Sequence, residues 1–350
     1  MSEPKKPPQQ QRTPVSDRGT PSQRQRILVL APNKPFLGAQ LVQLPFLSEL
    51  RSRNPEAVIT LALPFSGPSV FETFVFHDEI VAGWAESRRA TARFAGGVVG
   101  GRFDCVYSLR GRSARAGLVT LCSGARRRVG YRLGGSRLFF NVRVRPRERV
   151  YLALKYLDLL DGGRDEVPEV PLWTPEIERR VEALFRERAL GPPAVGLFVG
   201  AGGSKKRWPV GNFLALESEI RAARPGAEVL HFLSPEDASG PMGRELAGVE
   251  ARRKLSFEDL RFLACAFSRC TALISADCGP AHLGHLLGLP QVVLFDGGGR
   301  PHEWFRPRPH ARFLMAEDRK TVSSFGVREV RDAALGVIRA STPRGAKRRP

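Results

Sequence analysis

The sequence predicts an α/β protein with two domains, each built on a parallel β-sheet. Short apolar runs alternate with stretches that carry apolar residues at helical spacing, which is the pattern of βα units. The alternation is interrupted by the Gly- and Pro-containing stretch 162–175 and then begins again. The length of 350 residues also suits two domains of ordinary size. We therefore expect one domain over 26–165 and a second over 166–340.

The first domain is expected to contain three buried strands and the helices that connect them. Runs rich in Val, Ile and Leu predict strands, and longer amphipathic stretches predict helices. The predicted strands are 26–31, 57–63 and 103–109, and the predicted helices are 39–53, 84–98, 111–122 and 147–161.

The second domain repeats this alternation. Its predicted strands are 194–200, 227–233, 272–277 and 291–297, and its predicted helices are 175–190, one that begins near Pro209, 257–270, 280–288 and 323–340. In parallel sheets ligands bind at the carboxyl ends of the strands, so we expect a site in a cleft between the two domains.

The positive charge is concentrated in three segments. The chain has 55 Lys and Arg against 35 Asp and Glu, a formal net charge of +20. Residues 101–150 contain thirteen arginines, no lysine and two acidic residues. The segments 1–26 and 341–350 are also basic, and both ends are rich in Pro, Gln, Ser or Thr. We therefore expect disordered basic tails at 1–25 and 341–350.

Several broad classes are excluded or disfavoured by composition. A hydrophobic content of 42% is too high for a disordered chain, and no apolar run reaches the length of a membrane span. The first residues are polar and do not predict a secretory signal. The five cysteines form no CxxC pair, which favours a reduced, cytoplasmic compartment. The charge leaves nucleic acid, an anionic membrane surface or a polyanionic substrate as partners.

The sequence AGGSKKRWP over 201–209 follows a predicted strand and precedes a predicted helix. Glycines allow a ligand to approach the backbone, and free N–H groups at a helix start bind phosphate. Lys205, Lys206 and Arg207 add positive charge. The spacing is neither that of a P-loop nor that of a dinucleotide fingerprint. A tight turn with solvated lysines is the alternative interpretation.

A second candidate is SADCGPAHLGHLLGLP over 275–290. Asp277 ends a predicted strand and His282 lies in the first turn of the next helix, so both are expected to face the cleft. In the alternative interpretation Asp277 only caps the helix and His282 is packed inside the domain. The Gly-rich loop DGGGRPHEW over 296–304 is a third and weaker candidate.

Taken together, these motifs resemble glycosyltransferase family nine, the ADP-heptose:lipopolysaccharide heptosyltransferases. The resemblance covers about 26–340. GAGGSKKRWP matches the family's Gly-rich turn with K-x-W-P, and Lys206 is its lysine. The stretch from Ser275 to Pro290 matches S-x-D-x-G-P-x-H followed by G-x-P, and CSGARRRVGY over 122–131 is similar to a third family motif.

The resemblance implies a GT-B fold, in which two Rossmann-like domains face a central cleft. It also implies an inverting, metal-independent transfer from an ADP-sugar to a lipopolysaccharide-type acceptor, with no cofactor. The chain itself contains no DxD motif that would hold a metal-bound sugar nucleotide. The residues expected to bind the donor are Gly200, Ala201, Gly202, Lys206, Glu236, Asp277, Gly279 and His282.

The acceptor side departs from the family pattern. Where the family carries a catalytic aspartate after the first strand, this chain has Ala39, and a second family acid is replaced by Ser108. The base is therefore unknown, with Asp104 and Asp277 as candidates. The sequence favours an active transferase, but a degenerate homologue that only binds sugar nucleotide or lipopolysaccharide stays open, as does an RNA-binding protein.

The Arg-rich segment belongs to the domain that the resemblance assigns to the acceptor. Arginine forks suit phosphate and carboxylate, so we expect an anionic lipid-linked saccharide to bind there, with peripheral contact to the inner membrane and no specific nucleic acid. The candidate acceptor-binding residues are Arg110, Arg112, Arg126, Arg127 and Arg128.

Overall fold

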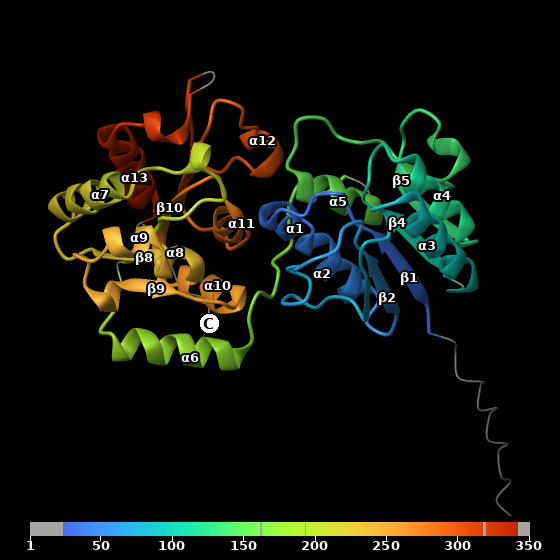
Figure 1. Ribbon diagram of the computed structural model, residues 1–350, viewed down its shortest axis with the longest axis horizontal. Coiled ribbons are helices and arrows are strands. Elements are labelled where there is room, and N and C mark those ends of the chain that lie inside the picture. Colours follow the sequence, from blue (N-terminus) through green and yellow to red (C-terminus); the bar gives the residue numbers. More distant parts are fainter. Residues whose placement is uncertain (1–23, 102, 162, 193, 318–319, 342–350) are drawn as a thin grey trace, which may run out of the picture.

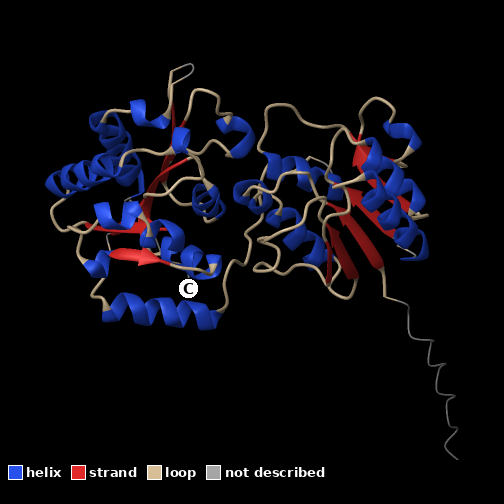
Figure 2. Cartoon of the chain, in the orientation of Figure 1, coloured by secondary structure: helices blue, strands red, loops and turns tan. Residues whose placement is uncertain are grey.

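The computed structural model describes residues 24–341, except for 102, 162, 193 and 318–319. It contains two six-stranded parallel sheets, one in each half of the chain, which lie side by side (Figure 1). Helices flank both sheets (Figure 2). The predicted α/β class with two parallel sheets is confirmed. The predicted tails at 1–25 and 341–350 lie almost wholly outside the described residues.

The N-terminal sheet has the strand order β3-β2-β1-β4-β5-β6, and all of its neighbours are parallel. The strands are β1 (Arg26–Leu30), β2 (Val58–Ala62), β3 (Glu79–Val81), β4 (Cys105–Ser108), β5 (Arg127–Tyr131) and β6 (Val142–Val144). The helices are α1 (Leu37–Leu41), α2 (Leu44–Arg53), α3 (Arg88–Gly101), α4 (Ala114–Cys122) and α5 (Leu152–Asp161), with a 3₁₀ turn, η1 (Ser136–Leu138).

The C-terminal sheet has the order β12-β11-β10-β7-β8-β9 and is also parallel. The strands are β7 (Ala194–Phe198), β8 (Glu228–Leu233), β9 (Lys254–Ser256), β10 (Cys270–Ala276), β11 (Gln291–Phe295) and β12 (Ala311–Met315). The helices are α6 (Pro175–Glu187), α7 (Val210–Ala223), α8 (Pro235–Ser239), α9 (Pro241–Glu245), α10 (Leu260–Ser268), α11 (Gly279–Leu286), α12 (Pro301–Trp304) and α13 (Val327–Ser341), with the 3₁₀ turns η2 (Ser204–Lys206), η3 (Ala251–Arg253) and η4 (Val322–Ser324).

Five strands were not predicted: β3, β5, β6, β9 and β12. Four of them lie at the edge of a sheet, where one face or one side is exposed and the sequence need not be continuously apolar. The fifth, β5, begins with two arginines that mask its apolar end. The predicted helix 39–53 is in fact two helices, and Pro45 lies in the first turn of the second.

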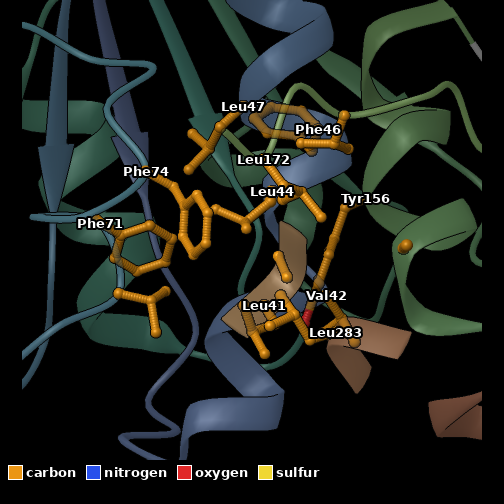
Figure 3. Packing of buried hydrophobic residues seen from close by; sticks show 14 of the residues in the cluster. Leu41, Val42, Leu44, Phe46, Leu47, Phe71, Phe74, Tyr156, Leu172 and Leu283 are labelled. Atoms are coloured by element: carbon orange, nitrogen blue, oxygen red, sulfur yellow. The ribbon is translucent and has the colours of Figure 1, made fainter. Parts of the chain in front are cut away.

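The helices of the N-terminal domain cover both faces of its sheet. The pair α3 and α4 covers the face directed away from the C-terminal domain, whereas α2 and α5 lie between the sheet and the C-terminal domain (Figure 1). The core on this inner side continues across the domain boundary, because Leu41 and Val42 belong to the same buried cluster as Tyr156 and Leu283 of α11 (Figure 3).

The two domains meet most closely where α1 and α11 begin. A Cβ at Gly38 would overlap the imidazole of His282, and a Cβ at Gly279 would overlap Leu37. Across the same boundary the Tyr151 ring lies edge-on to His285, with centroids 5.2 Å apart. Two glycines therefore allow the first turns of α1 and α11, one from each domain, to lie against each other.

Among the described residues, no helix is both long and apolar enough to cross a lipid bilayer.

A buried ionic cluster fixes α7 against the C-terminal sheet. Glu217 of α7 is 7% exposed, accepts a hydrogen bond from Arg253 and lies 2.7 Å from Nε2 of His231 on β8. Burial would raise the pKa of the Glu217 carboxyl, but hydrogen bonds from His231 and Arg253 outweigh it and lower the pKa to about 2. The negative charge of Glu217 therefore balances the positive charge of the buried Arg253 guanidinium.

Replacing Glu217 with Gln is expected to destabilise the chain by about 2–4 kcal/mol, because the buried Arg253 guanidinium loses its hydrogen-bonded carboxylate and keeps only the contacts of 3.7 Å with Glu250 and 3.9 Å with Glu228. The matched control is Glu182→Gln on α6, an exposed i,i+4 pair with Arg186, where we expect a change below about 0.5 kcal/mol. Urea unfolding at pH 7 measures both. Equal effects of the two substitutions would contradict a structural role for the buried cluster.

Candidate active site

The carboxyl ends of three neighbouring strands bring together residues that are far apart in the sequence. Strands β10, β7 and β8 are adjacent, so the loops that follow them lie along one edge of the sheet. Lys206, after β7, donates a hydrogen bond from its ammonium to the carboxylate of Asp277, after β10. Both side chains are partly buried. Each of the two motifs singled out in the sequence therefore contributes one member of an ion pair.

His282 completes this pair from the first turns of α11. Its Nε2 lies 3.9 Å from Oδ1 of Asp277, and its ring is stacked on Phe305 with centroids 4.5 Å apart. Burial lowers the pKa of His282 to about 4, which the Asp277 carboxylate opposes and the Lys206 ammonium assists. The imidazole is therefore neutral at pH 7 and is held in place by packing.

The glycines after β7 allow an acidic side chain to lie against the loop. A Cβ at Gly200 would overlap the carboxylate of Asp237, while Gly202 faces open space and Ala201 is buried. Arg207 donates from Nε to the Ala201 carbonyl at 3.2 Å and lies 3.8 Å from the Asp237 carboxylate. The loop thus keeps its open, glycine-lined side available for a ligand.

Asp237, which sequence reasoning missed, lies closer to this loop than Glu236 does. Ser234 accepts a hydrogen bond from the backbone N–H of Asp237 and donates one to its side chain at 2.8 Å. The spacing S-x-x-D before a helix is similar to a capping-box pattern, and it indicates that the Asp237 side chain lies near Ser234, the N-cap of α8. Glu236 is exposed and lines a cavity of about 600 Å³ together with Arg207, Trp208 and Met242.

The N-terminal domain places Gly38 and Ala39 opposite this cluster. Gly38 touches His282, and Ala39 is 4% exposed, with its carbonyl accepting a hydrogen bond from Gln43. Lys34, in the loop before α1, places its ammonium 4.6 Å from the centroid of the Trp304 ring. Position 39 carries no group that can exchange a proton.

A second cavity lies at the carboxyl edge of the N-terminal sheet. It has a volume of about 300 Å³, and four cationic side chains line it together with aromatic and aliphatic groups. The cations are Lys34, Arg110, Arg112 and Lys155. The Arg110 guanidinium lies 5.3 Å from the Trp84 ring, and its buried Nη1 has no hydrogen-bond partner among the residues that the structure describes. The cavity is therefore a concave, cationic surface with an unsatisfied donor.

The other candidates lie at the opposite edge of the same sheet. Asp104 precedes β4 and accepts a hydrogen bond from the backbone N–H of Arg26 at the start of β1. Arg126, Arg127 and Arg128 lie at the start of β5, and Arg128 donates to the carbonyls of Phe139 and Ala125. A strand of four or five residues, about 15 Å, separates them from the carboxyl edge. They are not part of the site that contains Arg110 and Arg112.

The sequence pattern of glycosyltransferase family 9 (heptosyltransferase) matches residues 91–321, about two thirds of the chain. The chain belongs to glycosyltransferase family 9. Solved structures agree with this assignment at the level of the fold. The family 9 protein from Veillonella parvula has a TM-score of 0.68 and 20% identity, and the match covers 90% of this chain and 97% of that chain.

Two E. coli structures resemble the family 9 chain over similar lengths. ADP-heptose LPS heptosyltransferase II has a TM-score of 0.63 and 20% identity, with 91% of this chain and 100% of that chain covered. Heptosyltransferase WaaC with ADP has a TM-score of 0.62 and 17% identity, with 89% and 99% covered. No curated protein matches the sequence. These likenesses confirm the GT-B fold, two Rossmann-like domains that face one another.

Acidification is expected to weaken the fold over a defined range. The pKa of His282 is lowered to about 4 and that of His285 well below its usual 6.5, in both cases mainly by burial. The unfolded chain therefore binds more protons below pH 6.5, so stability falls from about pH 6.5 down to about pH 4. His282→Gln removes one of these groups and should make the fall shallower, relative to its own value at pH 7.

The measurement is the free energy of unfolding in urea at several pH values from 7 to 4, for the wild type and His282→Gln. His302→Gln, which makes the same exchange at an exposed histidine, serves as the control for the substitution itself. Parallel curves for the wild type and His282→Gln would show that His282 is not kept neutral by the fold.

Proposed function

We propose that this family 9 chain transfers a sugar, most simply a heptose, from an ADP-sugar to an anionic, lipid-linked saccharide. The proposed reaction inverts the anomeric centre and requires neither a metal ion nor a cofactor. The observation that carries the proposal is the convergence of Lys206, Asp277 and His282 at the carboxyl edge of one sheet, directly against the start of α1 in the other domain.

The donor side is suited to a nucleoside diphosphate. Lys206 and Arg207 supply positive charge beside a glycine-rich loop, and the start of α11 adds backbone N–H groups. The adjoining cavity of about 600 Å³ is large enough for a nucleoside, and Glu236 at its rim can accept hydrogen bonds from ribose hydroxyls. These cations take the role that a metal has in other sugar transfers, the stabilisation of the departing diphosphate.

The acceptor side is suited to an anionic saccharide. The cavity with Lys34, Arg110, Arg112 and Lys155 combines positive charge with the aromatic rings of Tyr131 and Tyr156. Guanidinium groups bind phosphate and carboxylate in two-point contacts, and aromatic rings pack against sugar faces. A lipid-linked acceptor would also bring the chain into peripheral contact with the cytoplasmic face of the inner membrane.

The base of the proposed reaction is Asp277. Attack of an acceptor hydroxyl on the anomeric carbon breaks the bond to ADP, and the base takes the hydroxyl proton as ADP leaves. Ala39 cannot take that proton, and Asp104 lies at the wrong edge of its sheet. Asp277 is held at the domain boundary by Lys206 and lies beside the proposed donor site.

A second candidate function is donor binding without turnover. The observation that favours it is that the ion pair with Lys206 occupies Asp277, while position 39 carries only a methyl group. In that case the chain still binds ADP-sugar but forms no product. The two candidates share the donor site and differ in the transfer step.

Donor binding predicts that ADP raises the melting temperature. At an ADP concentration of roughly 100 times Kd, the free energy of unfolding should increase by about 2.7 kcal/mol. Lys206→Ala should weaken ADP about 30-fold or more, because a charge-assisted contact to the diphosphate is lost. The neighbouring Lys205→Ala is the matched control and should keep the shift, since Lys205 is exposed. A chelator should leave the shift unchanged. The absence of any shift with ADP or ADP-sugars would overturn the proposed donor.

Transfer predicts that Asp277→Asn lowers the rate of product formation at least about 100-fold, because the base is lost. Asp296→Asn, at the end of the next strand, is the control and should keep the rate within about threefold of the wild type. The assay follows transfer of the labelled sugar from ADP-sugar to a lipid-linked acceptor. Unchanged turnover in Asp277→Asn would assign the base elsewhere, and no turnover in the wild type with ADP binding intact would favour the non-catalytic candidate.

A further inference from the structure

The outer face of the N-terminal domain carries leucines that no other part of the described chain covers. Leu118 and Leu121 of α4 are 49% and 46% exposed, and Leu138 of η1 is 74% exposed. On the neighbouring helix α3, Val99 is 60% exposed. Both helices lie on the face that points away from the C-terminal domain (Figure 1). Large apolar side chains that remain exposed together indicate an interaction surface.

Packing between α4 and η1 brings together the two elements that carry these leucines. The Phe139 ring lies where a Cβ of Gly117 would be, 2.6 Å from that position, so η1 is pressed directly onto α4. Leu118 follows Gly117 in the sequence and Leu121 lies one helical turn further along the same ridge. Leu138 precedes Phe139 and remains outside. We call Leu118, Leu121 and Leu138 the leucine patch.

Three arginines flank the residues of the leucine patch along the chain. Arg115 lies one turn before Leu118 and donates to the carbonyl of Ala85, Arg126 follows the end of α4, and Arg137 precedes Leu138. All three are exposed. Within the described part of the chain, none of them lies within ion-pair distance of a carboxylate, and Asp104 is the sole acidic residue of the sequence between 87 and 147. The rim is therefore a net cationic surface.

We propose that the leucine patch and its arginine rim dock onto an anionic phospholipid bilayer. Leucines that enter the headgroup region gain from burial, and arginines around them pair with lipid phosphates, which is how interfacial amphipathic surfaces bind. A second copy of this chain fits less well, because a symmetric contact would bring the arginine rims together. A nucleic acid would pair with the arginines but leaves the leucines without a role.

The position of the patch is compatible with the proposed reaction. Arg110 and Arg112, which line the cationic cavity, are followed directly by Ser113, the N-cap of α4. A lipid-linked acceptor can therefore keep its acyl chains in the bilayer while its saccharide reaches the cavity at the start of the same helix. This step rests on the proposed function, but docking to lipid does not require transfer.

Vesicle co-sedimentation of the full chain, without donor or saccharide, tests the docking. The vesicles contain phosphatidylcholine alone, or phosphatidylcholine with about one part in three of phosphatidylglycerol. We expect binding to the anionic vesicles only. Replacing the three leucines of the patch with Gln should weaken it about tenfold or more, and Arg126→Ser with Arg137→Ser should do the same. All five positions are exposed, and melting temperatures verify that the variants fold.

The matched controls carry the same changes elsewhere on the surface. Val75→Gln with Met315→Gln replaces two other exposed apolar residues, and Arg179→Ser removes an exposed arginine of α6. These controls should bind as the wild type does, including any contribution from the basic ends of the chain.

Three results would overturn the docking proposal. The first is no preference of the wild type for anionic vesicles. The second is unchanged vesicle binding of the leucine variant, which would leave only an electrostatic contact between the arginines and the lipid and no role for the leucines. The third is a dimer of the wild type that the leucine substitutions dissociate, since a second copy would then cover the patch. None of these results bears on ADP binding, so the proposed function is tested separately.

Discussion

The contact between the start of α1 and the start of α11 determines how the two halves of the site meet. His282 is fixed by its stack on Phe305, and the backbone of Gly38 lies against its ring. A side chain at position 38 would force the two domains apart, because neither the imidazole nor its aromatic neighbours have room to move. With glycine there, the start of α1, which contains Ala39, and the preceding loop with Lys34 are held next to the Lys206–Asp277 pair.

The order of strands in each sheet explains why residues distant in the sequence act together. Since β7 lies between β8 and β10, the loops after these strands converge, and Lys206 reaches Asp277 across 71 positions of sequence. The same principle divides the arginines of the N-terminal domain. Those after β4 line the cationic cavity, whereas those at the start of β5 lie at the far edge of the sheet. Arginines of one basic segment thus lie on two separate surfaces of the domain.

The sequence predicted the central strands and singled out the two motifs whose side chains Lys206 and Asp277 meet, and it failed where burial is one-sided. Continuous apolar runs identify β1, β7 and β10, because these strands are covered on both faces. The run RRVGY of β5 hides a strand behind its arginines. Closeness in the sequence was also a poor guide to closeness in space. Arg112 and Arg126 belong to one basic segment but lie at opposite edges of the sheet. Asp237 was missed because its position depends on the cap at Ser234 and on the missing Cβ of Gly200.

The most direct test of this account is a crystal structure of the chain with an ADP-sugar bound. We expect the diphosphate to contact Nζ of Lys206 and the backbone N–H groups at the start of α11, with the nucleoside in the cavity beside Glu236 and Met242. The anomeric carbon should lie at the domain boundary with Asp277 as the nearest carboxylate. A nucleotide bound away from Lys206, or an anomeric carbon that faces away from the N-terminal domain, would contradict the account.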